Sequence, residues 1–242
     1  MLEFLPAPGS LPSHMRVYAV GDVHGCLDRL VAIHADIAAD LTERPVAEPL
    51  LIHMGDYVDR GPDSAGVIER LAEGHLPNLP VVNLPVINLM GNHEDLMLSA
   101  LEHPSDASVQ LWLMNGGANS LHSWGIPRTT AAAEWASRLP ARHLAFLRNL
   151  AVSHSAGDYL FVHAGVRPGL PLERQSPHDL LWIREPFLSS SADFGAVVVH
   201  GHTPRGRPEV RRNRIGIDTG AVMGGSLTCV VLEGDRMAFL SR

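Results

Sequence analysis

Side chains that can bind a metal ion recur along this sequence, each near a glycine and each at the end of a short apolar run. They are Asp22, His24, Asp56, Asn92, His163 and His202. Carboxylates, amide carbonyls and imidazoles are ligands that Mn, Fe, Zn, Ni and Co ions accept. The set therefore predicts a mixed nitrogen and oxygen site for divalent metal ions.

The types and spacing of these side chains predict a pair of ions. Asp22 and His24 are two residues apart, so both point to the same side of an extended chain and can bind one ion. Asp56 can bridge, because a carboxylate with one cation on each oxygen holds the pair roughly 3.5–4 Å apart, as in two-metal phosphatases. Such ions lower the pKa of a bridging water. We therefore expect in-line attack of a metal-bridging hydroxide on phosphorus.

Phosphoryl transfer also needs groups that neutralise the phosphate oxygens and a proton for the leaving alkoxide. Arg60 and Arg184 are the candidates for phosphate binding, because a guanidinium binds two phosphate oxygens at once. Asn92 is expected to contact the phosphate as well as a metal ion. His93 follows Asn92 and is the candidate acid, with Asp59 as the carboxylate that orients its ring.

The elements that must position these side chains are predicted from the spacing of apolar residues. Strands are expected at 16–20, 50–54, 86–90, 159–162 and 196–199, and helices at 27–40, 64–73 and 94–102. Residues 214–240 are expected to form a strand meander. Alternation of strands and helices indicates α/β layering. Ligands collect beyond the carboxyl ends of strands in such sheets, so the loops can converge on one site.

Length and composition favour one domain. The chain has 242 residues, 45% of them hydrophobic, and we expect a flexible N-terminal tail at 1–15 and a single domain at 16–242. A helical flank is expected at about 95–150. All 19 basic residues are arginine, which excludes Schiff-base chemistry and a P-loop lysine. The net charge of −7 argues against nucleic acid as a partner.

The compartment is predicted from cysteine usage and from the first residues. Cys26 and Cys229 are too few for a disulfide-stapled secreted scaffold. The first twelve residues lack the basic start of a signal peptide, and no apolar run reaches the roughly 20 residues that span a membrane. We expect a cytoplasmic protein without a membrane partner.

Three motifs carry a resemblance to a known family. Gly-Asp-Val-His-Gly at 21–25, Gly-Asp-Tyr-Val-Asp-Arg-Gly at 55–61 and Gly-Asn-His-Glu at 91–94 resemble the signatures of PPP-family metallophosphatases, within the calcineurin-like metallophosphoesterase superfamily. Further segments at 112–117, 182–185, 201–204 and 217–222 are similar to the short bacterial and phage branch of the lambda phosphatase type. The resemblance covers residues 16–233.

This resemblance implies more than the periodicity does. The implied fold is an αββα sandwich, in which two central mixed β-sheets are flanked by helices. The implied metal ligands are the six residues named first, and the implied acid pair is His93 with Asp59. Arg60 and Arg184 are implied as phosphate ligands. Two divalent ions are implied as cofactors, with Mn preferred and Fe, Zn, Ni or Co as alternatives.

The function stays open between three hypotheses. The first is a serine/threonine phosphoprotein phosphatase that hydrolyses phosphomonoesters; the second is a symmetrical bis(5'-nucleosyl)-tetraphosphate hydrolase; the third is a non-catalytic, metal-bound binding module. The Asp59-Arg60 pair and Glu94 resemble the protein-phosphatase pattern better. The expected partner is a phosphorylated protein or a small phosphoester. Oligomeric state is not predicted.

Three weaker signals are left without a role. His200 lies two residues before His202 and is kept out of the metal list. Cys26 begins a predicted helix, where a thiol pKa can fall, although a buried small residue is the commoner case. The arginines between 205 and 214 form either a solvated surface or a basic patch that attracts an acidic substrate.

Overall fold

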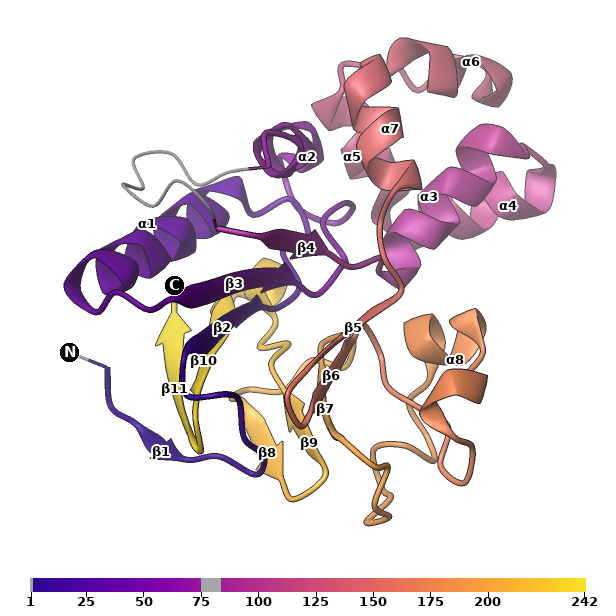
Figure 1. The fold of residues 1–242 in the computed structure, drawn as a ribbon. Coiled ribbons are helices and arrows are strands. Elements are labelled where there is room, and N and C mark those ends of the chain that lie inside the picture. Colours follow the sequence, from indigo (N-terminus) through magenta and orange to yellow (C-terminus); the bar gives the residue numbers. More distant parts are fainter. Residues whose placement is uncertain (1, 75–83) are drawn as a thin grey trace.

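Two β-sheets lie face to face at the centre of the protein (Figure 1). The computed structural model describes residues 2–74 and 84–242. The first sheet has the order β1 (Leu5–Pro6), β11 (Arg236–Ser241), β10 (Thr228–Glu233), β2 (Met15–Val20), β3 (Glu48–His53) and β4 (Val86–Asn88). The second has the order β5 (Ser153–Ala156), β6 (Tyr159–Val162), β7 (Val197–His200), β9 (Arg214–Gly216) and β8 (Glu209–Arg211).

Helices cover the outer faces of both sheets (Figure 1). The helices of the described residues are α1 (Leu27–Glu43), α2 (Ser64–Ala72), α3 (Asn92–Glu102), α4 (Asp106–Trp112), α5 (Ala118–Ser123), α6 (Ala132–Arg138), α7 (Ala141–Arg148) and α8 (Pro177–Trp182), with a π-helical turn at Leu113–Gly117 and 3₁₀ turns at Leu172–Arg174 and Ala221–Met223. In α1, Leu30, Ile33, Ile37 and Leu41 recur every three or four residues and are buried. This spacing gives the helix one apolar face, which packs on the first sheet.

The central strand β2 shows how the layers form. Val17 and Ala19 pack in a core with the second sheet, and Tyr18 and Val20 pack in another core with the helices. Consecutive residues of a strand point to opposite faces, so an all-apolar strand needs cover on both sides. β2 pairs with β3 in parallel and with β10 antiparallel. The predicted αββα sandwich of two mixed sheets is confirmed.

Residues 214–240 differ from the predicted meander. β9 pairs with β7 and β8 in the second sheet, whereas β10 and β11 form a hairpin beside β2 in the first sheet. The extended pattern is present, but it does not make one continuous meander. Apolar alternation identifies strands, whereas the choice of sheet depends on contacts between distant residues.

The N-terminal segment lies against the first sheet. Residues 5–6 pair with β11, and Leu11 is buried in the core between the sheets. The Phe4 ring lies 4.8 Å from the guanidinium carbon of Arg44 and 4.4 Å from that of Arg236. The flexibility predicted for residues 1–15 concerns motion and stays a prediction, as does the single-domain boundary at residue 16.

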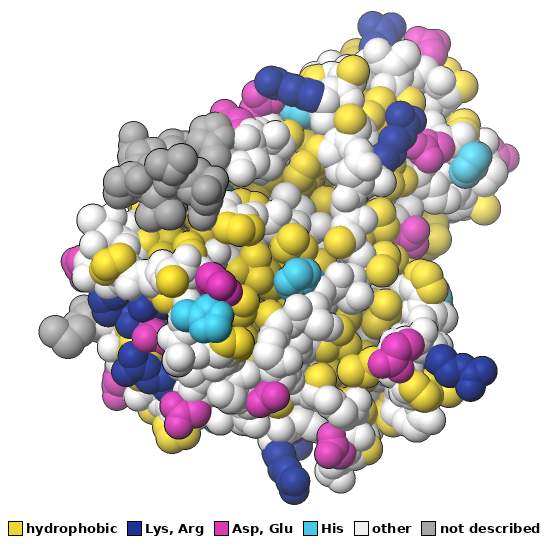
Figure 2. All heavy atoms as spheres, in the orientation of Figure 1, with side chains coloured by type: hydrophobic (Ala, Val, Ile, Leu, Met, Phe, Trp, Pro, Cys, Tyr) yellow, Lys and Arg dark blue, Asp and Glu magenta, His cyan; other side chains and the backbone are white. Residues whose placement is uncertain are grey.

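On the face of the protein drawn in Figure 2, basic side chains stand apart from one another among acidic ones. The arginines at 205–214 divide between surface and interior. Arg205 and Arg211 are exposed and pair with Glu209, whereas Arg214 is buried and donates to the same carboxylate at 3.0 Å.

Among the described residues, no helix combines the length and the apolar character needed to cross a membrane.

Two buried histidines join α1 to β3. The Nε2 atoms of His34 and His53 lie 2.9 Å apart, Arg70 Nε donates to His34 Nδ1 at 3.2 Å, and His53 Nδ1 lies 2.8 Å from Asn88 Oδ1. Because Arg70 can only donate, His34 Nδ1 accepts, and its Nε2–H donates to His53. Burial lowers the pKa of His34 to about 2, with help from His53 and Arg70. Burial also lowers the pKa of His53 to about 4.

We expect the protein to lose stability as the pH falls below about 6.5, the pKa of an unfolded histidine. The unfolded chain then binds protons that the two buried rings exclude, at a cost of about 1.4 kcal/mol of unfolding free energy per pH unit for each ring. His34→Gln keeps a neutral side chain that can accept from Arg70 and donate to His53. This change should flatten the pH dependence by about 1 kcal/mol per unit between pH 6 and 5, measured by urea unfolding.

The matched control for this prediction is His103→Gln, because His103 is exposed. It should keep the wild-type dependence of unfolding free energy on pH. An equally steep dependence in His34→Gln and in the wild type would mean that the buried pair does not cause the acid sensitivity.

Candidate functional site

Five of the six predicted ligands lie in loops at the carboxyl ends of parallel strands, and Asn92 is the first residue of α3, beyond the end of β4. β2, β3 and β4 run parallel in the first sheet, as do β6 and β7 in the second, so the loops that follow them meet at one edge of the sandwich (Figure 1). All six residues are buried. The structure brings them together, together with the predicted acid pair.

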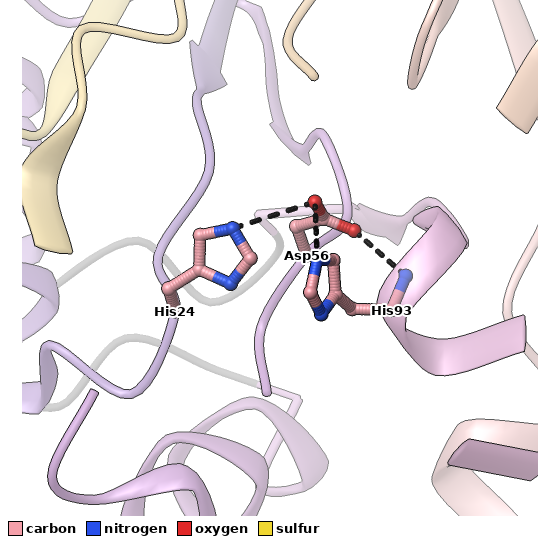
Figure 3. Close-up of side chains that lie close together, drawn as sticks. All are labelled: His24, Asp56 and His93. Atoms are coloured by element: carbon pink, nitrogen blue, oxygen red, sulfur yellow. Dashed lines mark hydrogen bonds and ion pairs between the residues drawn. The ribbon is translucent and has the colours of Figure 1, made fainter. Parts of the chain in front are cut away.

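Asp56 lies at the middle of the site. Its Oδ2 is 3.5 Å from His24 Nε2 and 4.0 Å from His93 Nε2, and its Oδ1 is 3.3 Å from His163 Nε2 (Figure 3 shows His24, Asp56 and His93). The backbone N–H of His93 also donates to Oδ1 at 3.0 Å. The two carboxylate oxygens therefore face two different groups of imidazoles, which is the arrangement that a bridging ligand requires.

Two triples of side chains could each hold a metal ion. They are His24, Asp56 and His93, and Asp56, His163 and His202, and in each triple the ligand atoms lie within 4.8 Å of one another. Asn92 joins the second triple, because its Oδ1 lies 3.0 Å from His163 Nε2 and 2.8 Å from His202 Nδ1. In the first triple His93 stands where the sequence predicts Asp22.

Asp22 contacts the site from its rim. Its Oδ2 accepts the backbone N–H of His202 at 3.0 Å, and its Oδ1 is buried without a hydrogen-bond partner among the described residues. A Cβ at Gly201 would collide with Oδ1, so the loop can approach the carboxylate only because that residue is glycine. A buried carboxylate oxygen without a donor fits a cation as its missing partner.

Backbone carbonyls fix the ring orientation of two predicted ligands. His24 Nδ1 lies 2.8 Å from the carbonyl of Val58, and His163 Nδ1 lies 2.8 Å from that of Met54. A carbonyl can only accept, so each Nδ1 carries the proton. Each Nε2 then faces Asp56 as the atom that can bind a metal ion.

The charges in the site also fit bound cations. Burial raises the pKa of Asp22 well above its usual range, and the nearby Asp218 carboxylate adds to the effect. Burial acts the same way on Asp56, but His163 and His93 outweigh it and hold the Asp56 pKa well below its usual range. Burial lowers the pKa of His24 and that of His202 to about 3, so both rings are neutral, as ligands must be. Burial acts the same way on His163, but Asp56 outweighs it and raises the His163 pKa to about 10, so this ring gives up a proton when it binds an ion. The residues present therefore fit a pair of divalent ions.

Backbone conformations are strained where the site residues lie. Among the described residues, the non-glycine positions with positive φ are His24, Asp56, Asp59, Arg60 and His202, with φ between 44° and 71°. All are predicted site residues. The left-handed region costs about 1–3 kcal/mol for such side chains, so other contacts must hold these loops. For His24, the extended chain expected from its spacing with Asp22 is replaced by a turn.

Glu94 supplies one such contact, and the sequence did not assign it a role. Its carboxylate is fully buried and accepts backbone N–H groups of Asp56, Tyr57 and Gly91 at 2.8–2.9 Å and that of Val58 at 3.2 Å. It therefore ties the Asp56 loop to the start of α3. The signal in the sequence that could have pointed to this role is the position of Glu94 in the motif Gly-Asn-His-Glu at 91–94.

A small cavity opens beside the metal-binding triples. It has a volume of about 170 Å³ and is lined by Asp56, Arg60, Asn92, Asn115, Trp182, Arg184 and His202. Both predicted phosphate-binding arginines are thus present, and Arg60 Nη1 also lies 3.0 Å from His24 Nε2. Asn115 and Trp182 belong to segments quoted for the family resemblance, but neither was singled out.

His93 and Asp59, which the sequence predicts as an acid pair, are in hydrogen-bond contact. His93 Nδ1 lies 2.8 Å from Asp59 Oδ2, and His93 Nε2 is buried without a hydrogen-bond partner among the described residues. Burial disfavours the charged ring, but Asp56 and Asp59 outweigh it and raise the pKa of His93. His93 can therefore hold a proton on each nitrogen and donate the one on Nε2.

The weaker signals lie outside both triples. His200 is buried, with its ring 5.0 Å from that of Phe187 and its Nε2 3.5 Å from Arg214 Nη1. Cys26 is buried beside the carbonyl of His24, and burial raises the pKa of its thiol. Neither residue belongs to a described group of metal-binding side chains.

A sandwich of two mixed sheets with carboxylates and imidazoles gathered at the strand ends defines a metal-dependent phosphoesterase. The chain belongs to the calcineurin-like phosphoesterase family, whose profile matches residues 15–224. It is 31% identical over 224 residues to serine/threonine-protein phosphatase 1 of Salmonella typhimurium, covering 90% of this chain and 92% of that protein.

The chain is also similar to phosphatases that are named for other substrates. A symmetrical bis(5'-nucleosyl)-tetraphosphatase of Nitrosospira multiformis is 26% identical over 283 residues, covering 93% of this chain and 95% of that protein. The solved structure of a cold-active protein tyrosine phosphatase superposes with a TM-score of 0.60 at 17% identity, covering 97% of this chain and 81% of that one. The structural likeness supports the fold.

Proposed function

We propose that this protein is a serine/threonine phosphoprotein phosphatase that hydrolyses phosphomonoesters. The observation that carries the proposal is His93, whose buried Nε2 has no hydrogen-bond partner among the described residues and whose Nδ1 is held by Asp59. An alkoxide is a poor leaving group, so its departure depends on a proton donor. The relationship to a serine/threonine phosphatase at 31% identity supports the same substrate class.

The residues of the chain would act as follows. Arg60 and Arg184, which line the cavity, bind the phosphate oxygens and offset their negative charge. Water's oxygen forms a bond to phosphorus as the bond to the leaving oxygen breaks. The leaving oxygen keeps the electrons of the broken bond and takes the proton from His93 Nε2. A proton from the attacking water then returns to the imidazole through solvent.

The proposed cofactors are two divalent metal ions. The proposed ligands are Asp22, His24, Asp56, Asn92, His163 and His202. Bound ions would lower the pKa of a coordinated water and offset charge on the phosphate. We propose Mn, with Fe, Zn, Ni or Co able to use the same ligands, since availability decides among such ions as much as affinity does. Action in the cytoplasm on a phosphorylated protein or small phosphoester stays part of this proposal.

The dinucleotide hydrolase is the second candidate, supported by the Nitrosospira relative. Cleavage of a tetraphosphate bridge releases a phosphate-bearing leaving group, which departs with less help from an acid than an alkoxide needs. The buried acid pair therefore favours phosphomonoesters.

The test compares substrates on one preparation. Protein stripped of metal and reloaded with Mn²⁺ is assayed on a phosphoserine peptide, a phosphotyrosine peptide and diadenosine tetraphosphate. We expect kcat/KM on the phosphoserine peptide to exceed that on the dinucleotide at least tenfold, that is by about 1.4 kcal/mol of transition-state binding. Preference for the dinucleotide would move the protein to nucleotide hydrolysis. No hydrolysis of any of the three substrates by the metal-bound protein would favour the non-catalytic binding module.

A further inference from the structure

The Asp59 carboxylate has two neutral donors besides His93. Trp112 Nε1 lies 3.0 Å from both Asp59 oxygens, and Ser120 Oγ donates to Oδ1 at 2.6 Å. Asp59, Trp112 and Ser120 are all fully buried. The His93 ring approaches Oδ2 alone. The two donors therefore leave Asp59 one direction in which to bind His93.

Both donors come from the helical flank, far from Asp59 in sequence. Trp112 ends α4 and Ser120 lies in α5, with the π-helical turn at Leu113–Gly117 between them. Trp112 is held edge to face against Trp135, with ring centroids 5.7 Å apart. A Cβ at Gly117 would collide with the Trp112 ring, so the turn closes over the indole only because that residue is glycine.

Ser120 also holds the backbone of Asp59. Its Oγ accepts the backbone N–H of Asp59 at 2.8 Å while it donates to the carboxylate of the same residue. Asn119 Nδ2 donates to the carbonyl of Arg60, the next residue. Asp59 and Arg60 both have positive φ, 71° and 65°. The flank therefore fixes a strained turn and the direction of its carboxylate together.

We propose that Trp112 and Ser120 are positioning residues for the proton donor: by binding the Asp59 carboxylate they aim Oδ2 at His93 Nδ1, and so hold Nε2 where it meets the leaving oxygen. The inference rests on the proposed acid role of His93. The proton lost by Nε2 is the one gained by the leaving oxygen, and Trp112 and Ser120 keep their own protons. Neither residue touches the substrate.

The competing explanation is that Trp112 and Ser120 only anchor the flank to the sandwich. An anchor would affect all substrates alike. A residue that orients the acid affects a substrate according to how much its leaving group needs a proton. Phenyl phosphate and 4-nitrophenyl phosphate are both aryl phosphates but differ strongly in this respect, because phenolate is the poorer leaving group.

The experiment measures kcat on both aryl phosphates for Trp112→Phe and Ser120→Ala in the Mn-loaded protein. Trp112→Phe keeps an aromatic ring and removes the indole N–H. We expect kcat to fall about tenfold on phenyl phosphate and less than about twofold on 4-nitrophenyl phosphate, with KM unchanged, as part of the roughly 10²–10⁴-fold that an acid contributes. In a His93→Ala background, Trp112→Phe should cost nothing further on phenyl phosphate.

Two matched controls come from the same flank. Trp124→Phe removes an indole bond to His143, and Ser123→Ala removes a hydroxyl bonded to Asp63. Both should keep the wild-type ratio of the two rates. Trp112→Phe or Ser120→Ala alone is enough for the test, so the experiment can still be done if one of the two variants does not fold.

Equal losses on both aryl phosphates, no loss on phenyl phosphate, or an added loss in the His93→Ala background would overturn the positioning role. The aryl ratio does not depend on the natural substrate. If Trp112→Phe or Ser120→Ala changes the ratio of the two rates but the wild type does not hydrolyse the phosphoserine peptide, the proposed function fails and the positioning role stands.

Discussion

The Asp56→Asn variant is expected to bind metal at least about 10–100-fold more weakly than the wild type and to lose most of its turnover. Removal of a residue that only hydrogen-bonds a metal ligand already weakens metal binding by about this factor, and Asp56 is proposed as a ligand itself. Asp56 is shared by both metal-binding triples, with one oxygen toward His24 and the other toward His163. Asparagine keeps the shape but removes the negative charge and places an amide N–H₂ group where one oxygen stood. Metal content by elemental analysis and kcat on 4-nitrophenyl phosphate measure the two effects.

Asp63→Asn is the matched control for this substitution. Asp63 lies in the same loop but caps α2, accepting the backbone N–H of Gly66 at 2.8 Å. It should keep wild-type metal content, with at most a small loss of stability. Full metal content and full turnover in Asp56→Asn would refute the shared ligand, and loss of turnover with full metal content would assign Asp56 a role other than metal binding.

The gathering of the ligands could be predicted from the sequence because its signals are local. Each ligand follows the end of a strand and lies near a glycine, and parallel strands end at the same edge of a sheet. Asp56 and Asn92 could therefore be placed together without knowledge of the loops. The bounds of the strands also depend on local signals: β6 was predicted at the residues where it lies, and the other four predicted strands end within two residues of their predicted bounds.

The contacts that hold the loops could not be predicted, because they join residues far apart in sequence. Glu94 accepts from a loop 36–38 residues earlier, and Trp112 donates to a carboxylate 53 residues earlier. No periodicity reports such pairs. The αββα layering likewise required the family resemblance, and β9 joined the second sheet through pairing with β7.

These distant contacts and the strained loops belong together physically. Five site residues adopt the left-handed region that glycine favours, yet their side chains are needed there for chemistry. Glycine would relieve the strain and lose the ligand or the acid partner. The fold instead holds the loops with Glu94 from the first turn of α3 and with Ser120 from α5 in the helical flank.

His93→Ala is expected to lower kcat on a phosphoserine peptide by roughly 10²–10⁴-fold, the usual contribution of a general acid. The loss arises because the serine alkoxide must then leave without a proton from the enzyme. The loss should be much smaller on 4-nitrophenyl phosphate, whose leaving group is stable as an anion. Metal content should stay near wild type, because Asp56, His163, His202 and Asn92 remain. Steady-state kinetics on both substrates and elemental analysis make the measurement.

The control is His122→Ala, because His122 is exposed on α5, outside both triples. It should leave both rates unchanged. An unimpaired rate of His93→Ala on the peptide would refute the acid assignment and, with it, the positioning roles of Trp112 and Ser120. A large loss accompanied by loss of metal would instead place His93 among the ligands, where its Nε2, 4.0 Å from Asp56 Oδ2, would complete the first triple in place of Asp22.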